Sequence, residues 1–314
     1  MKVLVTGANG FIGRAVVAEL LRRGHQVTAA VRTPSGVQAT RVVVVGEVDE
    51  RTDWTDALRG NDVVLHLAAH VHVLDRTAAK DLERFRQVNA TGTERLATAA
   101  ANAGVRRFVF LSTVGVHGTE SGARPFRESD PPRPAIAYAQ SKWEAEERLQ
   151  AIGTARGMAY TILRPPLVYG PGVEAKFLQL LAILRRGIPL PFGAVNNRRS
   201  MIYIGNLVDA TIVAAESDEV RNKTFFVTDQ ETWSIGELVR VLAELMNKPP
   251  RLVSIPESLI RLGARLTRQT ERLRPLLGSL VVDDTAFRAA TGWKQPYSAK
   301  EGLAETVRWY FGRR

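Results

Sequence analysis

The sequence predicts an α/β protein: a doubly wound parallel sheet, followed by a smaller region of mixed helices and strands. Three observations support this fold class. The chain opens with a β-branched run, a glycine-rich turn, an amphipathic stretch and a second apolar run. Short apolar runs then alternate with stretches of helical periodicity as far as residue 172. Beyond residue 172 the alternation loosens, and short strands and helices mix.

The opening unit of the chain predicts a strand, a tight turn, a helix and a second strand. Residues 2–6 form an apolar, β-branched run that suits a buried parallel strand, and residues 27–31 repeat this pattern. Between them, Gly7, Gly10 and Gly13 stand at the start of the helical stretch. Glycines at such a turn let a pyrophosphate approach the free N–H groups of the helix N-terminus. The unit therefore predicts a dinucleotide site; the alternative is a turn that only packs helix on strand.

The end of the second strand bears on which dinucleotide is bound. An acidic side chain at this point would hold the ribose hydroxyl groups of NAD. This chain has Arg32 there, followed by Thr33 and Ser35. A guanidinium beside hydroxyl groups suits the 2′-phosphate of NADP, so NADP is favoured over NAD. Alternatively, Arg32 is a surface arginine or stacks on the adenine.

The composition is that of an ordinary globular protein. Of 314 residues, 45% are hydrophobic and 24% are charged, which allows one large α/β domain and a smaller one. The sequence contains no cysteine, which excludes disulfides, thiolate metal sites and a cysteine nucleophile. It begins with a strand rather than a signal peptide, and no apolar run approaches the ~20 residues of a membrane span. We therefore expect a soluble cytoplasmic protein.

The formal net charge of +11 is consistent with an anionic cofactor and an anionic substrate. A nucleic-acid surface is the rival explanation, but no recognition motif or aromatic-basic interleaving occurs. Much of the excess charge follows residue 250, where arginines and leucines make the pattern of an amphipathic helix. We expect a solvated helix face; the helix could also cover the substrate site or rest on an anionic membrane surface. Its arginines are Arg261, Arg265, Arg268, Arg272 and Arg274.

The remaining elements are expected in chain order, with strands that alternate with helices and so form a parallel sheet. Residues 1–172 are expected to form the dinucleotide-binding domain, to which 201–216 return, and the rest of 173–314 a discontinuous smaller lobe. The first part has strands at 41–45, 63–69, 108–111 and 160–163, and helices at 53–58, 88–103 and 138–149. The second part has helices at 177–186, 206–216 and 234–246, strands at 201–204 and 225–227, and a loop at 189–199.

Tyr138 and Lys142 carry the predicted chemistry. They are four residues apart at the start of an expected helix, so their side chains share one face. A lysine ammonium lowers the pKa of a nearby phenol and makes it an acid or base near neutral pH. Upstream, a predicted strand ends in Ser112 and Thr113, whose hydroxyl groups can polarise a substrate carbonyl or alcohol beside the phenol. The alternative is a half-buried packing tyrosine with a solvated lysine.

A set of motifs resembles those of the extended short-chain dehydrogenase/reductases. In chain order they are T-G-A-N-G-F-I-G at the glycine turn, H-L-A-A at 66–69, the Ser-Thr strand end, Y-A-Q-S-K at 138–142 and R-P-P-L-V-Y-G-P-G at 164–172. Within that superfamily the chain resembles the NAD-dependent epimerase/dehydratase family, which acts on nucleotide sugars. The resemblance covers essentially the whole chain and implies a Rossmann-type sheet with a nucleotide-sugar-binding lobe. It also implies a homodimer through a four-helix contact, here residues 89–102 and 142–153.

The resemblance assigns roles to individual residues. Thr113, Tyr138 and Lys142 correspond to the catalytic triad, with Thr113 where UDP-galactose 4-epimerases carry a catalytic Ser or Thr. Asn89 would support the active-site helix. The residues expected to line the cofactor are Gly7, Gly10, Phe11, Ile12, Gly13, Arg32, Glu47, Val48, Leu67, Ala68, Ala69, Asn89, Leu111, Ser112, Tyr138, Lys142, Pro165 and Val168. Those expected to contact a UDP-linked sugar are His70, Thr113, Val114, Tyr138, Phe177, Pro191, Arg199 and Arg274.

The segment 177–200 resembles the part of the family that clamps uridine and the diphosphate. Arg199 falls where the family places a pyrophosphate-binding arginine, and a guanidinium fork suits two phosphate oxygens. Arg272 or Arg274 would supply a second phosphate contact. The polar neighbours that we interpret as loop residues rather than ligands are Asn196, Asn197 and Arg198.

The chain also departs from the family pattern. His117 stands where the family often has a tyrosine; we expect it to pack under the loop, and a proton relay is the alternative. His70 and His72 are interpreted as contacts or surface residues, because no carboxylate or cysteine at ligand spacing completes a metal site. His25 and His66 are interpreted as structural. No acid follows Thr113 directly, which argues against the 4,6-dehydratase branch.

The enzyme functions that the resemblance implies share hydride transfer at C4 of a UDP-linked hexose, with Tyr138 moving the hydroxyl proton. A UDP-4-keto-hexose reductase of surface polysaccharide synthesis is favoured, because Arg32 favours NADPH and residues 196–200 resemble such reductases. A UDP-hexose 4-epimerase that retains NAD, acting on UDP-glucose or UDP-N-acetylglucosamine, is the close alternative. A non-catalytic NADP-sensing or nucleic-acid-binding regulator is a further hypothesis, and the intact set of Thr113, Tyr138 and Lys142 argues against it.

Overall fold

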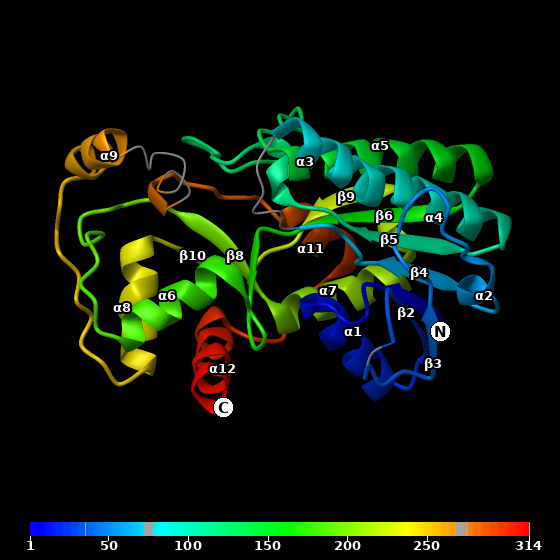
Figure 1. The fold of residues 1–314 in the computed structure, drawn as a ribbon, viewed down its shortest axis with the longest axis horizontal. Coiled ribbons are helices and arrows are strands. Elements are labelled where there is room, and N and C mark those ends of the chain that lie inside the picture. Colours follow the sequence, from blue (N-terminus) through cyan, green and yellow to red (C-terminus); the bar gives the residue numbers. More distant parts are fainter. Residues whose placement is uncertain (35, 72–77, 268–272, 274–275, 314) are drawn as a thin grey trace.

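The computed structural model describes residues 1–34, 36–71, 78–267, 273 and 276–313. It shows a seven-stranded sheet and, beside it, a three-stranded sheet (Figure 1). The strand pairs of the larger sheet are parallel, in the order β3-β2-β1-β4-β5-β6-β9. This is the Rossmann-like α/β fold that the sequence predicts. The strands are β1 (Lys2–Thr6), β2 (Gln26–Val31), β3 (Arg41–Val44), β4 (Val63–His66), β5 (Arg107–Leu111), β6 (Ala159–Arg164) and β9 (Lys223–Phe226).

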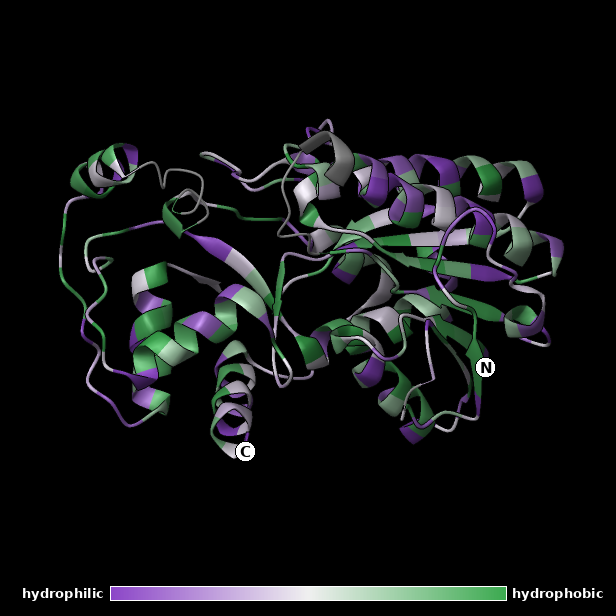
Figure 2. Ribbon diagram, viewed as in Figure 1, coloured by the Kyte–Doolittle hydropathy of each residue, from purple (hydrophilic) through white to green (hydrophobic). Residues whose placement is uncertain are grey.

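Helices cover both faces of the large sheet. α1 (Phe11–Arg22) and α7 (Ile204–Glu216) share one hydrophobic core with it, and α4 (Gly92–Asn102) and α5 (Ala137–Arg156) share another. In β1, Val3 and Val5 belong to the first core and Leu4 to the second. Successive side chains of a strand point to opposite faces, so a strand covered on both faces is apolar throughout. Figure 2 shows these strands largely hydrophobic and the outer helix surfaces mixed.

The strand order changes direction at β1, which has β2 on one side and β4 on the other. In doubly wound sheets a ligand binds beyond the carboxyl ends of the strands at this point. The glycine turn follows β1, and residues 67–69 follow β4. A Cβ added to Gly7 would lie 2.8 Å from the Cα of Ala68, so these two segments are in direct contact. The fold therefore places the predicted dinucleotide turn where this fold class binds ligands.

Several expected elements have different bounds. The strand expected at 63–69 ends at His66 as β4. The helix expected at 88–103 is preceded by α3 (Ala78–Phe85) and by a π-helical segment, η1 (Arg86–Thr91), which leads into α4. Asn89 lies in η1, so this irregular turn falls at a residue that is expected near the active site, as π-helical turns commonly do. Similarly, α5 continues past the expected residue 149 and stops at Gly157, whose φ of +68° is a common helix terminus.

The smaller sheet has the order β10-β8-β7. β8 (Arg199–Tyr203) is parallel to β7 (Leu167–Tyr169) and antiparallel to β10 (Thr232–Trp233). The sequence analysis does not anticipate β7 or β10, because both are too short to show a periodicity. Around this sheet lie α6 (Ala175–Arg185), α8 (Ile235–Leu245), α9 (Glu257–Leu266) and α12 (Ala299–Gly312), as Figure 1 shows. The remaining short helices are α2 (Thr55–Leu58), η2 (Val114–His117), η3 (Asp218–Val220) and α11 (Thr285–Thr291).

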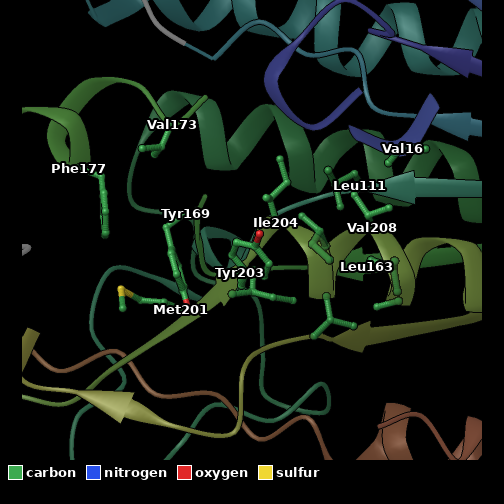
Figure 3. Close-up of a cluster of buried hydrophobic side chains, with 14 of the residues drawn as sticks. Val16, Leu111, Leu163, Tyr169, Val173, Phe177, Met201, Tyr203, Ile204 and Val208 are labelled. Carbon is green, nitrogen blue, oxygen red and sulfur yellow. The ribbon is translucent and has the colours of Figure 1, made fainter. Parts of the chain in front are cut away.

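We call the large sheet with its helices the large-sheet part, and β7, β8 and β10 with α6, α8, α9 and α12 the small-sheet part. One hydrophobic core joins them and extends from Val16 and Leu111 through Val208 and Ile204 to Phe177 (Figure 3). The chain passes from one part to the other more than once, since β8 leads into α7 and β9 pairs with β6. Within the described ranges, no helix combines the length and apolarity needed to cross a membrane.

Candidate active site

The glycine turn is tightly closed. Gly7 has a φ of +66°, a left-handed conformation that favours glycine, and its carbonyl accepts the N–H of Gly10 at 2.9 Å. A Cβ on Gly13 would lie 2.1 Å from that carbonyl oxygen, which is closer than real atoms approach. Gly10 is the N-cap of α1 and brings no side chain to the helix N-terminus. The turn therefore fits a coenzyme pyrophosphate, which would accept from the first backbone N–H groups of α1.

Arg32 at the end of β2 pairs with Glu47 after β3, with 3.5 Å between Nη1 and Oε1. Both side chains are exposed, so the pair contributes little stability. It nevertheless holds a carboxylate beside the guanidinium that would have to bind the 2′-phosphate of NADP. Val48 packs against α4, because a Cβ on Gly92 would lie 2.7 Å from its Cγ1. A cavity of about 600 Å³ opens here, lined by Glu47, Val48, Asp49, Glu83, Arg84, Gln87 and Val88.

A directed chain of hydrogen bonds runs through His66. The Thr93 hydroxyl donates to the Asn89 carbonyl at 2.6 Å, so its oxygen accepts from His66 Nε2–H at 2.9 Å. His66 Nδ1 then accepts from the Thr6 hydroxyl at 2.7 Å, and Thr6 Oγ1 accepts the N–H of Ala68 at 3.2 Å. The network assigns the ring proton to Nε2. The chain links the strand before the glycine turn to η1, which is the structural role expected for this histidine.

The His66 ring is buried and stacks on Phe110 at 5.6 Å between centroids. Burial and, secondarily, the nearby Lys142 lower the pKa of His66 to about 3. The ring is therefore neutral at physiological pH. A neutral imidazole with a fixed tautomer positions its neighbours and does not exchange protons with them.

Asn89 connects the loop after β4 to α5. Its Oδ1 accepts the N–H of His70 at 2.8 Å, and its Nδ2 donates to the His70 carbonyl at 3.1 Å and to the Ser141 hydroxyl at 3.0 Å. The Ser141 hydroxyl donates to the Tyr138 carbonyl at 2.8 Å. This geometry supports the first turn of α5 in the way that the resemblance implies. A direct contact between Asn89 and a coenzyme stays a prediction.

Tyr138 and Lys142 lie one turn apart at the start of α5. Lys142 is 1% exposed, and its Nζ lies 4.1 Å from the centroid of the Phe110 ring. Burial lowers the pKa of Lys142 to about 7, although Glu146 opposes this shift. Burial raises the pKa of Tyr138 to about 12. The sequence predicts that the ammonium lowers the phenol's pKa, and this prediction is wrong: burial raises that pKa, because desolvation disfavours the charged phenolate.

Thr113 follows β5 and caps η2. Its Oγ1 accepts the N–H of Gly115 at 3.1 Å, an arrangement in which the hydroxyl proton can be directed to another oxygen. A Cβ on Gly115 would lie 3.3 Å from the Cβ of Ala139, the residue after Tyr138. The end of β5 therefore lies directly beside the first turn of α5. The structure brings Thr113 to the same sheet edge as Tyr138.

A buried ion pair beside the lysine is the main feature that the sequence analysis misses. Glu146 is 0% exposed and lies one turn after Lys142 on α5. Arg164, at the end of β6, donates from Nε to Glu146 Oε1 at 3.0 Å and pairs with it through Nη2. The Ser112 hydroxyl donates to the same carboxylate. The sequence does place Glu146 on the same face of the expected helix as Tyr138 and Lys142, two turns after Tyr138. This spacing could have predicted a carboxylate beside the lysine.

His117 extends this network. Arg164 Nη1–H donates to His117 Nε2 at 2.6 Å, so the proton of the neutral ring is on Nδ1. Burial, together with the charge of Arg164, lowers the pKa of His117 to about 4. The ring packs between Phe126 and Phe226. His117 is thus a buried neutral acceptor under the loop, the packing role that we expect, rather than a proton relay near neutral pH.

Arg199 opens β8 in the small-sheet part, and its Nη1 donates to the Gly278 carbonyl at 2.9 Å. Burial lowers the pKa of Arg199, and Glu120 opposes this shift; an arginine stays charged in proteins. Its neighbour Asn197 accepts the N–H of Ile235 at 3.0 Å and donates to Gly278. Asn197 therefore orders the loop through hydrogen bonds within the protein, whereas Arg199 places a half-buried positive charge at the start of β8.

The other expected substrate contacts include one residue in the core and one beside Tyr138. Phe177 lies in the core with its ring 5.7 Å from that of Tyr169 (Figure 3). The His70 ring lies 5.3 Å from Phe85, whose ring lies 6.0 Å from Tyr138, so these aromatic side chains are next to one another. The residues named in the sequence analysis that lie outside the described part of the chain are Ser35, His72, Arg268, Arg272 and Arg274.

The remaining cofactor candidates lie at the ends of the elements that meet at the crevice. The half-buried ones are Phe11, Ile12, Leu67, Ala69 and Val168, and the buried ones are Leu111, Ser112 and Pro165. Val114 is buried against Phe226, and Pro191 is half buried in the small-sheet part. Among the residues whose positions the structure describes, no three His, Asp or Glu side chains gather as a metal site would require.

Comparison with known proteins identifies the family. The sequence model of the NAD dependent epimerase/dehydratase family matches residues 3–233. The chain belongs to this family. It is 37% identical over 309 residues to a UDP-glucose 4-epimerase of Vibrio cholerae, a match that covers 97% of this chain and 94% of the relative. A 2-alkyl-3-oxoalkanoate reductase of Stenotrophomonas maltophilia is 31% identical over 296 residues, covering 88% and 84%.

A solved structure agrees with this assignment. MoeE5 in complex with UDP-glucose and NAD is 27% identical and superposes with a TM-score of 0.80 over 99% of both chains. Family membership confirms the resemblance stated from the motifs, the Rossmann-like fold and the prediction of an NAD-dependent enzyme of the extended short-chain dehydrogenase/reductase type.

Proposed function

We propose that this member of the family is a UDP-hexose 4-epimerase that works with NAD. The observation that carries the proposal is the 37% identity to the Vibrio cholerae UDP-glucose 4-epimerase over nearly the whole of both chains. MoeE5, with its UDP-glucose and NAD, supports the same ligand pair. The sequence alone favours a reductase because of Arg32. Glu47 weakens that argument, since it stands 3.5 Å from the guanidinium that would bind the 2′-phosphate.

We propose that the coenzyme lies across the glycine turn, along residues 67–69, and reaches the ends of β5 and α5. When bound, NAD supplies a carbon that accepts a hydride and returns it. The protein supplies the proton transfer. Tyr138 takes the proton of a substrate hydroxyl group and gives it back, and the Thr113 hydroxyl donates to the same oxygen. A charged Lys142 offsets part of the burial penalty on the phenolate form of Tyr138, whose pKa stays above its ordinary value.

The ion pair beside Lys142 has a place in this proposal. Lys142 must be charged to assist the phenol, yet its burial favours the neutral amine. Glu146 raises the pKa of Lys142 and so favours the ammonium. Arg164 and Ser112 donate hydrogen bonds to the Glu146 carboxylate and so hold it in place. We propose Glu146 as a positioning residue that keeps the lysine usable near neutral pH.

We propose that the small-sheet part holds the nucleotide. Arg199 is half buried, charged and already fixed by one hydrogen bond to Gly278, so little side-chain entropy is lost when it binds a diphosphate. Pro191 lies on the loop before it. Phe177 would support this region from the core rather than touch the sugar.

An NADP-dependent UDP-4-keto-hexose reductase is the second candidate. The specific observation in its favour is that Arg32, rather than an acid, follows β2. It shares the roles of Tyr138, Lys142 and Thr113 with the epimerase. The two differ in the fate of the coenzyme, because an epimerase returns the hydride to the sugar and a reductase consumes NADPH.

Incubation without added coenzyme separates these candidates. The purified protein is given UDP-glucose or UDP-N-acetylglucosamine, and the products are followed by proton NMR. Appearance of the 4-epimer, with NAD released when the protein is denatured, supports the epimerase. Oxidation of NADPH only in the presence of a UDP-4-keto sugar, with no epimer formed, supports the reductase. If neither reaction occurs with any UDP-hexose, both proposals are wrong.

We also propose that residues 1–172 and 201–216 form the coenzyme domain, and that the protein is a cytoplasmic homodimer. α4 and α5 lie side by side on the outer face of the large sheet (Figure 1) and, with the end of η1, carry the residues 89–102 and 142–153 named for the four-helix contact. Light scattering on the purified protein tests the dimer, and charge reversals on the outer surfaces of these helices would dissociate it.

A further inference from the structure

α9 carries an apolar stripe that faces away from the protein. The helix packs on the rest of the chain through Ile260 and Ala264, which are 8% and 4% exposed. Leu259, Leu262 and Leu266 are 56%, 52% and 78% exposed and fall within about 60° of one another around the helix axis. They point roughly opposite to the packed side. We call these three leucines the α9 stripe; Figure 2 shows both hydrophobic and hydrophilic residues on this helix.

The α9 stripe is flanked by positive charge. Arg265 lies next to Leu262 around the helix, and Arg261 follows, paired with Glu257 through Nη2 at 2.6 Å. Upstream of the helix, Arg251 and Val253 are also exposed. In the sequence, the eight residues after Thr267 add three arginines and one glutamate. The region therefore joins an exposed apolar surface to a net positive charge.

The position of α9 favours contact with a large, flat partner. The helix lies at the end of the molecule farthest from the large sheet (Figure 1), and the catalytic candidates lie at the carboxyl edge of that sheet. Three outward leucines on ten residues form a small surface, which suits a shallow insertion rather than a deep groove. A helix of this length, about 15 Å, lies in an interface and does not cross one.

We propose that the α9 stripe docks on an anionic membrane surface. Leucines that insert at the acyl boundary, with arginines beside them at the level of the headgroups, match the chemistry of an interfacial helix. Each arginine near an anionic leaflet strengthens the binding, and the overall charge of +11 adds to the attraction. A second copy of the chain fits less well, because a twofold contact through the stripe would bring Arg265 against its own copy.

Binding of this kind is weak, reversible and sensitive to salt, because it combines a small apolar area with screened charges. It would hold the protein at a leaflet without burying its active site. The proposal does not depend on the epimerase assignment, since no residue of the α9 stripe belongs to the site described above.

Vesicle sedimentation with the full-length protein tests the proposal. We expect partition onto phosphatidylcholine vesicles that contain about one third phosphatidylglycerol to exceed partition onto pure phosphatidylcholine by at least about tenfold. High salt should abolish the difference. The variant Leu259→Ser, Leu262→Ser, Leu266→Ser should lose about tenfold or more of the binding, and Arg265→Glu should weaken binding to anionic vesicles only.

The matched control replaces exposed apolar residues elsewhere, Ile188→Ser and Phe311→Ser, which are 45% and 47% exposed; it should bind as the wild type does. Far-UV circular dichroism confirms that each variant is folded, and enzymatic activity without vesicles should be unchanged in all of them. Equal binding by wild type and the stripe variant would overturn the proposal. It would also be overturned if the stripe variant alters only the oligomeric state, or only the capture of an acidic protein.

Discussion

At the candidate site, the large-sheet and small-sheet parts hold their charged side chains differently. In the large-sheet part, His66, Glu146 and Arg164 are buried and each is fixed by several directed hydrogen bonds. In the small-sheet part, Arg199 is half buried, and Arg198 pairs with Glu237 at the surface. Buried hydrogen-bond networks fix the positions of their side chains. Exposed charges contribute little to stability, so they can bind ligands without being needed for the fold. Substitutions of these buried residues should therefore change rate or folding, and substitution of Arg199 should change affinity.

The largest effect is expected from Tyr138→Phe, which removes the group that moves the substrate proton. The rate of epimer formation should fall by about 10²–10⁴-fold. The phenol hydroxyl is not part of the networks around His66 or Glu146, so the melting temperature should change little. The measurement is NMR turnover beside a thermal scan. Full activity in the variant would contradict the proposed chemistry.

Glu146→Gln should affect folding most, because it leaves Arg164 buried without its counter-charge. The expected loss is about 3–5 kcal/mol in the free energy of unfolding, measured in urea. Glu144→Gln on the same helix is the matched control; it breaks a partly exposed pair with Arg86 and should cost under about 1 kcal/mol. A loss at Glu146 as small as that at Glu144 would show that the buried network does not stabilise the fold.

Glu146→Gln also tests whether Glu146 raises the pKa of Lys142. Without the charge of Glu146, the pKa of Lys142 should fall below its value of about 7, so the ammonium is lost at a lower pH. The alkaline limb of the pH–rate profile should move to lower pH in Glu146→Gln. A profile that keeps its shape, with only the stability reduced, would assign Glu146 a purely structural role.

Arg199→Gln should act mainly on affinity. Loss of a charge-assisted contact to a diphosphate costs about 1.5–3 kcal/mol, which corresponds to an increase of about 10- to 100-fold in KM with kcat nearly unchanged. Arg198→Gln, next to it but paired with Glu237 at the surface, is the control and should change KM little. Equal effects of the two substitutions would argue against a specific role for Arg199.

The buried histidines of the large-sheet part should respond to acid oppositely to Asp229, a buried carboxylate that accepts hydrogen bonds from Tyr169 of β7 and Tyr203 of β8. His66 and His117 have pKa values lowered to about 3 and 4, so below pH 6.5 the unfolded chain binds protons that the folded chain does not. Each should lower the free energy of unfolding by about 2 kcal/mol between pH 6.5 and 5. Burial raises the pKa of Asp229 to about 6, so the folded chain binds the extra proton there and gains about 1 kcal/mol between pH 6 and 5.

Urea titrations at several pH values separate these contributions. The stability of His117→Gln should fall less steeply on acidification than that of the wild type, and the stability of Asp229→Asn should fall more steeply. Parallel curves for all three proteins would contradict the assigned pKa shifts.

The smallest effect is expected at the coenzyme pocket. Glu47→Gln removes a carboxylate that competes for Arg32 and would repel a 2′-phosphate. The ratio of NADP to NAD affinity, measured by fluorescence titration, should rise severalfold, because exposed pairs contribute less than about 1 kcal/mol. Glu50→Gln, an exposed acid paired with Arg51, should leave the ratio unchanged. A ratio that does not respond to Glu47 would show that this pair does not select the coenzyme.

The sequence predicts the strands of the large sheet and the glycine turn well, because their signals are local. β1 and β2 agree with the expected ranges to within a residue, α1 lies between them as expected, and Gly7 does need its left-handed φ. The sequence does not predict η1, because its irregular turn coincides with the contacts of Asn89 to His70 and Ser141, residues distant in the chain. Local periodicity carries no information about such contacts.

The candidate site likewise has features that local spacing predicts and features that only the folded chain brings together. Thr113, Tyr138 and Lys142 are found by spacing, but the partners of Glu146 come from β5 and β6, which only the folded sheet brings together. The direction of the pKa shift at Tyr138 depends on desolvation, which sequence spacing does not report. Likewise, leucines and arginines after residue 250 predict an amphipathic helix, but only the structure shows which leucines face outward.

The return of the chain from β8 through α7 to β9 constrains how the protein is made. β9 completes the sheet by pairing with β6, and α7 packs against α1, so the coenzyme-binding sheet needs residues that lie beyond Arg199. During synthesis, the first 172 residues would leave the ribosome with the β6 edge unpaired and the apolar side of α1 uncovered. A nascent chain of that length is a target for chaperones, and neither part is a module that recombination could move intact into another protein.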